Sequence, residues 1–152
     1  MVTYQEESWT QIEEELKELF PEHWEETEVD KYEIELNPDY ELYQTLDKLN
    51  KIQVITVREN KKLIGYHISL LSFNMHSKKS FTAFTDSFFI KKEFRKGQIG
   101  IKLFQYMEKK LKEKNVQKIY VGTKFTLDLS RLFEYLNYKP VEKIYSKLLI
   151  KE

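Results

Sequence analysis

Near residue 95 the spacing of the apolar residues changes from that of a strand to that of a helix. Residues 80–90 are rich in Phe and Thr and predict a β-strand, because these types favour a pleated, half-buried surface. Residues 98–114 place apolar side chains every three or four positions, which predicts a helix with one buried face. A short basic loop, 94–100, joins the two, and residues 116–122 predict another strand. The order indicates a βαβ-like unit.

Two helices and two further strands are expected before this unit, and a short helix and a last strand after it. Pro21 is expected to end the first helix, and Pro38 to stand at the first position of the second. Polar turns join the three central strands, so these should pair as an antiparallel meander. These elements are predicted at 6–20, from 37, at 52–57, 63–71, 129–136 and 141–150. The order predicts one α+β domain over 1–152, with a mixed, mostly antiparallel sheet flanked by about four helices.

The composition excludes several classes of protein. The chain has no Cys, which removes disulfides, Cys-ligated zinc and thiol nucleophiles. Its three His are scattered without ligand spacing, so no metal site is expected. No apolar run approaches the roughly 20 residues of a membrane span, and Glu6 and Glu7 stand where a signal peptide would be basic. We therefore expect a cytoplasmic protein that does not interact with membranes.

The net charge of zero conceals an asymmetry along the chain. Residues 1–40 contain fourteen Asp and Glu against two Lys, whereas residues 41–152 contain eleven acids against twenty-three Lys and Arg. The acidic part disfavours nucleic acid, and the sequence carries no nucleic-acid recognition motif. The basic part suits an anionic ligand, although two solvated faces of one domain would give the same pattern.

The loop after residue 90 has the features of a phosphate-binding cradle. The N–H groups at a helix N-terminus and the helix dipole favour phosphate oxygens, and glycine permits close approach of the backbone. Arg and Lys side chains add positive charge. A purely structural strand–turn–helix would look similar, because short glycine motifs match freely. The candidate cradle residues are Arg95, Lys96, Gly97, Gln98, Ile99 and Gly100.

These residues resemble the arginine/glutamine-x-x-glycine-x-glycine/alanine loop of the GNAT acyltransferase family. One position departs from that pattern, because Gln98 stands where the family usually has Gly, and the Gly is one place earlier, at Gly97. Residues 132–138 resemble the family's leucine-tyrosine-glutamate-x-leucine-glycine-phenylalanine helix end. The likeness spans nearly the whole chain. More narrowly, residues 65–67, 82–86 and 118–124 resemble a small group of phage-encoded GNAT proteins of unassigned substrate.

The resemblance implies an acetyl-CoA site between the family's fourth and fifth strands, which correspond here to residues 80–90 and 116–122. These two strands separate in this family. Backbone groups of Phe88, Phe89 and Ile90 would then bind the pantetheine arm, and an N–H there would polarise the thioester carbonyl. Thr123, Lys124 and Arg131 would face the cofactor, although a capped helix start at Asp128 explains this stretch equally well. Phe133 stands where family members often carry a tyrosine that protonates the leaving thiolate. It cannot donate a proton, so the general acid stays unassigned.

Asp86 is the candidate general base, because many GNAT proteins carry a glutamate at this place. We expect it to be partly buried among Phe and Thr, where a carboxylate becomes more basic; the alternative is an Asp bonded to backbone amides. His23 and Trp24 are expected after the first helix, over the acceptor site, with a Trp packed on the core as the alternative. Tyr66 and His76 are further candidates for contact with the acceptor.

The preferred reading is an N-acetyltransferase that moves an acetyl group from acetyl-CoA to a primary amine by direct attack. The acidic N-terminal part favours a cationic small molecule or protein as acceptor. A catalytically silent GNAT-like domain that binds acyl-CoA or a protein partner is the alternative, favoured by Phe133 and Gln98. A cofactor-free interaction module is a third reading. The resemblance also implies a homodimer that pairs through the last strand, at residues 144–150.

Overall fold

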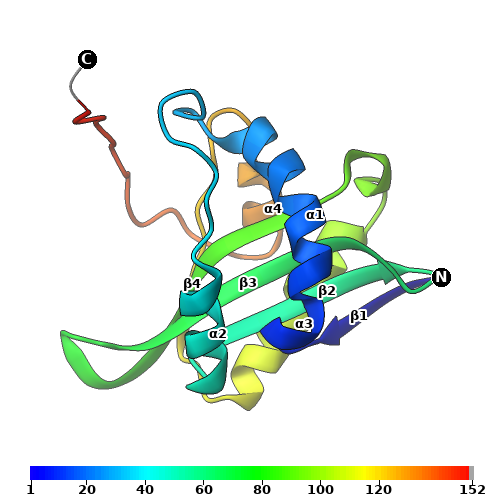
Figure 1. The fold of residues 1–152 in the computed structure, drawn as a ribbon. Helices are drawn as coiled ribbons and strands as arrows, with labels where there is room; N and C mark the ends of the chain where they lie inside the picture. Colours follow the sequence, from blue (N-terminus) through cyan, green and yellow to red (C-terminus); the bar gives the residue numbers. More distant parts are fainter. Residues whose placement is uncertain (151–152) are drawn as a thin grey trace.

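A computed structural model describes residues 1–150, which form a five-stranded sheet with helices on both faces (Figure 1). The strand order is β1-β2-β3-β4-β5; β1 to β4 are antiparallel neighbours and β5 runs parallel to β4. This confirms the predicted mixed, mostly antiparallel α+β fold. The elements are β1 (Val2–Glu6), α1 (Trp9–Thr27), α2 (Tyr40–Lys48), β2 (Ile52–Glu59), β3 (Lys62–Asn74), β4 (Ser77–Ile90), the 3-10 turn η1 (Lys92–Phe94), α3 (Ile99–Glu113), β5 (Lys118–Tyr120) and α4 (Ser130–Tyr135).

The N-terminal part differs from the prediction at both ends of the first helix. An edge strand, β1, precedes the helix, and α1 begins at Trp9 because Ser8 and Gln11 form a reciprocal capping box. Pro21 does not end the helix, which continues to Thr27. Proline removes one helical hydrogen bond, but the turns after it are held by contacts with β4 and with the loop that follows β4.

The second helix starts later than Pro38. Asp39 caps it by accepting a hydrogen bond from the Leu42 N–H at 2.9 Å, so α2 begins at Tyr40. The side of α2 that carries Tyr43 and Leu46 packs against the core, whereas Leu49 is 61% exposed. α2 therefore presents Tyr43 to the sheet.

The three central strands form the predicted meander. Asn60 and Lys61 both have positive φ, which is the geometry of a tight hairpin turn between β2 and β3. The β3–β4 hairpin is longer than predicted, because its turn contains only Met75 and His76. Its pairing is irregular at one functionally relevant place: Ser87 pairs with Ile68 and Thr85 with Ser69, which leaves Asp86 as the extra residue of a β-bulge.

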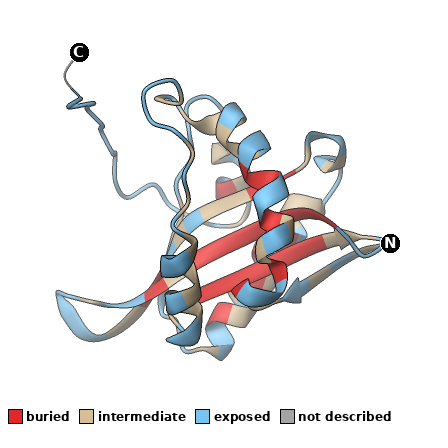
Figure 2. Cartoon of the chain, in the orientation of Figure 1, coloured by how far each residue is buried: buried red, intermediate tan, exposed pale blue. Residues whose placement is uncertain are grey.

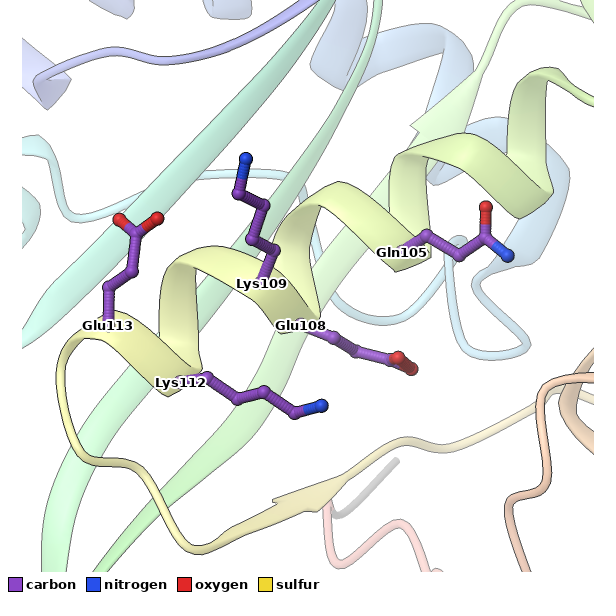
Figure 3. A pocket seen from close by; sticks show the side chains of 5 residues that line it. All are labelled: Gln105, Glu108, Lys109, Lys112 and Glu113. Atoms are coloured by element: carbon purple, nitrogen blue, oxygen red, sulfur yellow. The ribbon is translucent and has the colours of Figure 1, made fainter.

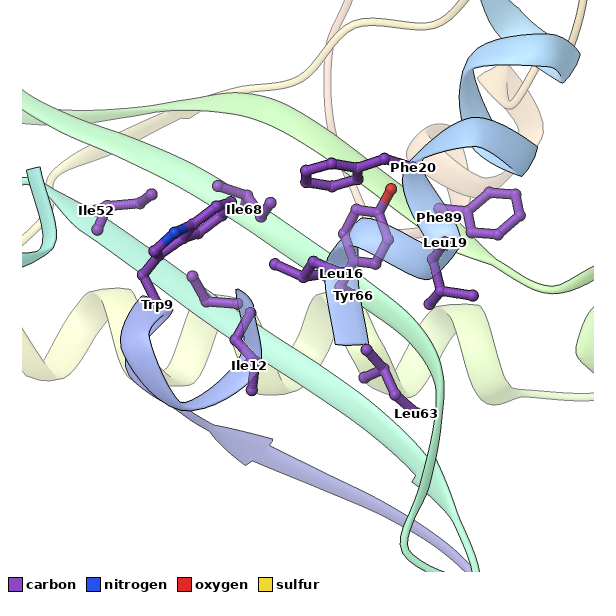
Figure 4. Close-up of a cluster of buried hydrophobic side chains, with 11 residues drawn as sticks. Trp9, Ile12, Leu16, Leu19, Phe20, Ile52, Leu63, Tyr66, Ile68 and Phe89 are labelled. Carbon is purple, nitrogen blue, oxygen red and sulfur yellow. The ribbon is translucent and has the colours of Figure 1, made fainter. Parts of the chain in front are cut away.

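Two hydrophobic clusters lie on opposite faces of the sheet. The buried residues are concentrated in the central strands and in the helices that cover them (Figure 2). α1 and α2 cover one face, where Trp9, Ile12 and Leu16 are fully buried against β2 and β3 (Figure 4). α3 and α4 cover the other face, with Leu103, Phe104 and Phe133 in the second cluster. The two sides of the sheet are thus separate surfaces, and a residue on β4 faces either α1 and α2 or α3 and α4.

The C-terminal strand predicted at 141–150 is not formed. Residues 139–150 have no regular structure and extend away from the rest of the chain (Figure 1). A strand needs a hydrogen-bonded neighbour to be stable, and within the described residues this segment has none. Its apolar side chains are exposed, among them Ile144 at 84% and Leu149 at 80%.

His67 is a fully buried histidine on β3, and it gives the fold a predictable dependence on pH. Its Nδ1 lies 3.3 Å from the Ser69 hydroxyl and its Nε2 lies 3.2 Å from the Thr85 hydroxyl. Burial lowers the pKa of His67 to about 3, so the folded protein keeps the ring neutral. Between about pH 6.5 and pH 3 the unfolded chain therefore binds a proton that the folded chain does not, and stability falls as the pH falls.

We expect His67→Gln to reduce the loss of stability between pH 7 and pH 5, because a neutral amide replaces the titrating ring. Each pH unit below about 6.5 costs about 1.4 kcal/mol for one such histidine, so the wild type should lose about 2 kcal/mol more than the variant by pH 5. Urea unfolding at pH 7, 6 and 5 measures this. His76→Gln, at the exposed hairpin turn, is the matched control and should keep the wild-type slope. Equal slopes for His67→Gln and the wild type would contradict the assignment.

Candidate active site

β4 and β5 separate soon after they pair. Their ladder contains only three residue pairs, from Thr82 with Lys118 to Phe84 with Tyr120. At the last pair the two aromatic rings stack with centroids 4.5 Å apart. Beyond it β4 continues to Ile90, and the side of β4 opposite β3 has no strand partner among the described residues. The second half of β4 is therefore not paired with the segment that follows β5, and we call this gap in the strand pairing the opening.

The backbone of β4 presents free polar groups to this opening. The Lys91 N–H donates to the Ile64 carbonyl on β3 at 2.9 Å. Because alternate residues of a strand direct their N–H and C=O groups to opposite neighbours, Ile90 and Phe88 direct theirs away from β3. The Phe89 carbonyl, by contrast, lies close to β3, because a Cβ on Gly65 of β3 would be 2.7 Å from its oxygen. The Phe88 N–H and C=O and the Ile90 N–H are thus directed to the side where the fifth strand is absent, whereas the Ile90 carbonyl accepts a hydrogen bond from Arg95.

The loop between β4 and α3 ends in an open helix start. Gly97 has φ +64°, a conformation that L-residues other than glycine rarely adopt, so the displaced glycine of the motif carries the turn. Gln98 is the N-cap of α3 and makes no side-chain capping bond, which leaves the first N–H groups of the helix available. A Cβ on Gly100 would meet only the Ile90 side chain, at 3.8 Å. This surface has the room and the donors that a phosphate group needs.

Arg95 makes three contacts within the protein. Its guanidinium donates to both carboxylate oxygens of Glu26, at 2.7 and 3.1 Å, and to the Ile90 carbonyl at 2.6 Å. Burial opposes ionisation of Glu26, but hydrogen bonds and charges from Arg95 and Lys92 outweigh it and lower the pKa of Glu26. Arg95 therefore joins the end of α1 to the end of β4, while Lys96 remains exposed on the same loop. Sequence reasoning did not identify Glu26 as the partner of Arg95.

Asp86 lies at the β-bulge of β4, on the side covered by α1 and α2. It is exposed rather than partly buried as predicted, and as the extra residue of the bulge it has no paired residue on β3. Its Oδ2 accepts a hydrogen bond of 2.6 Å from the Tyr43 hydroxyl of α2. Burial and this hydrogen bond raise the pKa of Tyr43, so its hydroxyl stays protonated and acts as the donor. The predicted alternative, bonds to backbone amides, is not what the structure shows.

His23 and Tyr66 lie beside the end of β4, and Trp24 follows His23 on the same helix. His23 and Trp24 belong to α1 itself, because the helix does not stop at Pro21. The His23 ring stacks on Phe89 with centroids 5.1 Å apart, and its Nδ1 shares a hydrogen bond of 2.8 Å with the Tyr66 hydroxyl. Burial lowers the pKa of His23 to about 4, so the ring is neutral at physiological pH. Tyr66 has no exposed surface and acts here as a core residue.

His76 is not brought together with the other candidates. It lies in the turn between β3 and β4, ten residues along the chain from Asp86. At about 3.3 Å per strand residue, this separation is about 30 Å. His76 is therefore far from the opening, because the hairpin is longer than the sequence indicated.

The segment after β5 returns to the opening through α4. The Thr123 hydroxyl accepts from the Leu129 N–H at 2.7 Å, and Asp128 accepts from the Ser130 N–H at 3.0 Å, although the N-cap residue of α4 is Leu129 and not Asp128. Lys124 forms an isolated bridge with Leu127, and Arg131 is exposed on α4. Phe133 is buried against Phe104 and Phe88, with ring centroids 5.6 and 6.3 Å away. Thr123 thus stabilises the loop, and Phe133 belongs to the core.

A surface hollow of about 490 Å³ lies elsewhere, along the outer face of α3 (Figure 3). Its side chains carry both signs of charge and come from the middle and end of the helix, about 7 Å or more along its axis from Gly100 at 1.5 Å per residue. This hollow is distinct from the opening beside β4. Its lining residues are Gln105, Glu108, Lys109, Lys112 and Glu113.

Solved structures of the same fold are acetyltransferases. A predicted acetyltransferase from Clostridium acetobutylicum, solved with acetyl-CoA, has a TM-score of 0.73 and 13% identity, over 98% of this chain and 97% of that one. Aminoglycoside acetyltransferase meta-AAC0020 from an uncultured soil metagenomic sample, in complex with sisomicin, has a TM-score of 0.72 and 18% identity, over 97% and 96%. Aminoglycoside N-acetyltransferase AAC(6')-Iy, in complex with CoA, has a TM-score of 0.71 and 10% identity, over 98% and 100%.

The sequence itself identifies the family. The model of the acetyltransferase (GNAT) family matches residues 9–133, and the chain belongs to this family. No curated protein sequence gives a significant match. The narrower likeness to phage-encoded members stays a prediction. No helix within residues 1–150 is long and apolar enough to cross a membrane.

Proposed function

We propose that the protein is an acetyl-CoA-dependent N-acetyltransferase of the cytoplasm that acetylates a primary amine by direct attack. The observation that carries this proposal is the opening between β4 and β5. The start of α3, which has no side-chain cap, follows the end of β4, and Asp86 lies on the same strand. When bound, acetyl-CoA would supply an activated acetyl group as a thioester. The remaining requirements, which are binding, polarisation and proton removal, fall to residues of this chain.

The cofactor would be held at two places. The free N–H groups from Gln98 to Gly100, with Lys96 nearby, suit the pyrophosphate, because donors and the helix dipole favour negative charge there. The backbone groups of Phe88 and the N–H of Ile90 suit the pantetheine amides, since only the Ile90 carbonyl is already bonded, to Arg95. An N–H of this edge would polarise the thioester carbonyl. Arg95 contributes mainly by holding the loop against α1, since Glu26 already pairs with its charge.

Asp86 would accept the proton that the acceptor amine must lose. It lies on the α1–α2 side of the sheet, and seven of the fourteen acidic residues of the first forty positions belong to α1, which covers that side. This charge supports a cationic acceptor such as a lysine side chain, a polyamine or an aminoglycoside-like amine. The aminoglycoside acetyltransferases among the structural neighbours are compatible with the last of these.

Calorimetric titration with acetyl-CoA tests the cofactor site first. Saturable binding at micromolar concentration is expected, followed by CoA thiol release when spermine, sisomicin or a lysine peptide is added. Neutral and acidic amines form the control panel, and equal turnover with them would contradict a cationic acceptor. Binding without turnover against any amine would favour the silent acyl-CoA-binding domain, which the buried, hydroxyl-free Phe133 supports. Absence of binding would overturn both.

The C-terminal segment supports a homodimer as part of this proposal. Residues 141–150 carry exposed apolar side chains, among them Ile144 and Leu149, and β5 is an edge strand of only three residues. An exposed apolar segment and an unpaired sheet edge are complementary, and pairing of residues 141–150 with a second copy of the chain would bury this segment as a strand. We expect sedimentation velocity to show a dimer that Ile144→Lys with Leu148→Lys converts to a monomer. Lys143→Ala with Lys147→Ala is the matched control and should remain dimeric; a monomeric wild type would contradict the proposal.

A further inference from the structure

The Asp86 carboxylate is bound through only one of its two oxygens. The Tyr43 hydroxyl donates to Oδ2 at 2.6 Å, and the Ser87 hydroxyl approaches the same atom at 3.4 Å. Among the described residues no hydrogen bond reaches Oδ1, and the side chain is exposed. One oxygen is thus fixed by the protein, and the other is available to a molecule on the α1–α2 side.

The position of the Tyr43 hydroxyl is set by packing between α1 and α2. The Tyr43 ring stacks on the Trp9 indole, with centroids 4.2 Å apart and planes inclined by 7°. Trp9 is fully buried, and its Nε1 donates to Glu13 at 2.8 Å; Gln44, next to Tyr43, donates to the same carboxylate oxygen at 2.9 Å. The Tyr43 ring is therefore held on its face by Trp9 of α1, and the adjacent Gln44 is tied to α1 through Glu13. This packing directs the Tyr43 hydroxyl towards β4.

We propose that Tyr43 is the positioning residue of Asp86, and this inference rests on the proposed transferase function. By holding Oδ2, Tyr43 would direct Oδ1 towards the acceptor nitrogen. The ammonium of the acceptor gives one proton to Oδ1, and its freed lone pair forms the N–C bond to the acetyl group as the C–S bond breaks. The acylated nitrogen loses its second proton to the departing sulfur, which leaves as the CoA thiol, and the proton on Oδ1 passes to solvent. Preorganised geometry of this kind contributes to the rate of the chemical step, because misplacing the general base lowers kcat while the substrates still bind.

Tyr43→Phe is the direct test, because it removes the hydroxyl and keeps the ring stacked on Trp9. With the amine that turns over in the screen, we expect kcat to fall about tenfold while the acceptor KM and the acetyl-CoA Kd change less than about twofold. Tyr40→Phe is the matched control: its ring also contacts Trp9, at 6.5 Å, but no hydrogen bond joins it to Asp86. Its kcat should match the wild type.

A double-mutant cycle separates positioning from a general structural effect. If Tyr43 acts through Asp86, then Tyr43→Phe has no further effect on kcat in an Asp86→Ala background. An equal loss of kcat in both backgrounds would overturn the inference.

The same cycle in urea unfolding does not depend on turnover. Tyr43→Phe should lower the unfolding midpoint in the wild-type background and leave it unchanged in Asp86→Ala, because the lost bond is already absent there. Equal shifts in the two backgrounds would overturn the inference even in an active enzyme. Coupled midpoints in a protein that acetylates no amine would support the Tyr43–Asp86 bond and overturn the transferase proposal alone.

Discussion

Asp86→Asn is expected to lower kcat about 100-fold while acetyl-CoA binds with its wild-type Kd. An amide cannot accept the ammonium proton, and positioned general bases contribute about 10²–10⁴-fold to rate. The fold should persist, because Asn can still accept the Tyr43 hydroxyl bond through its side-chain oxygen. Steady-state kinetics of CoA release, together with calorimetry, measures the two constants separately.

The control for this substitution is Asp47→Asn, which removes the same charge from the end of α2. Asp47 makes no side-chain hydrogen bond to Asp86 or Tyr43, so its kcat should equal that of the wild type. If Asp86→Asn turns over at the wild-type rate, Asp86 is not the base. A parallel loss in Asp47→Asn would instead attribute the effect to the summed negative charge that attracts the acceptor.

Gly100→Glu is expected to weaken acetyl-CoA binding about 100-fold or more, equivalent to about 2.8 kcal/mol. The new carboxylate would occupy the first turn of α3, where the phosphates are expected, and would repel them. The substitution fits the fold, since a Cβ at this position meets only the Ile90 side chain at 3.8 Å. An acidic residue near a helix N-terminus is also favourable to the helix. Calorimetric titration measures the change.

Two variants on the same helix make this result specific. Gly100→Ala adds a methyl group without charge and should bind acetyl-CoA nearly as the wild type does. Gln105→Glu adds the same charge on the exposed outer face of α3 and should also bind normally. If Gly100→Glu keeps its acetyl-CoA affinity, the phosphates lie elsewhere. If Gln105→Glu binds as weakly as Gly100→Glu, long-range charge rather than local contact explains the loss.

Local sequence patterns predicted an element correctly where the residues that stabilise the element lie within one short stretch of the chain. The α3 helix needs only its own apolar spacing, and it was predicted to within one residue at each end. The left-handed Asn137 after α4 and the polar turn before β3 follow from local side-chain preferences in the same way. The GNAT family was likewise recognised from the loop at 95–100 and the helix end at 132–138.

Errors occurred where a distant partner decides the outcome. Pro21 is a local signal for a helix end, but contacts of His23 with Phe89 and of Glu26 with Arg95 keep α1 intact beyond it. β1 has too few residues to be recognised without the β2 edge that pairs with it. The segment 141–150 has a strand pattern but no neighbour within the described chain.

The sequence by itself determined the order of the helices and strands from α1 to α4, the glycine-containing loop that opens α3 and the place of Asp86 on β4, because each depends on residues adjacent in the chain. Only the tertiary structure decided which side of the sheet Asp86 faces, because a single bulge residue reverses the alternation along a strand. It alone paired Asp86 with Tyr43, forty-three positions away, and Arg95 with Glu26, sixty-nine positions away. No local pattern encodes such pairs, since they exist only after helices and sheet have packed together.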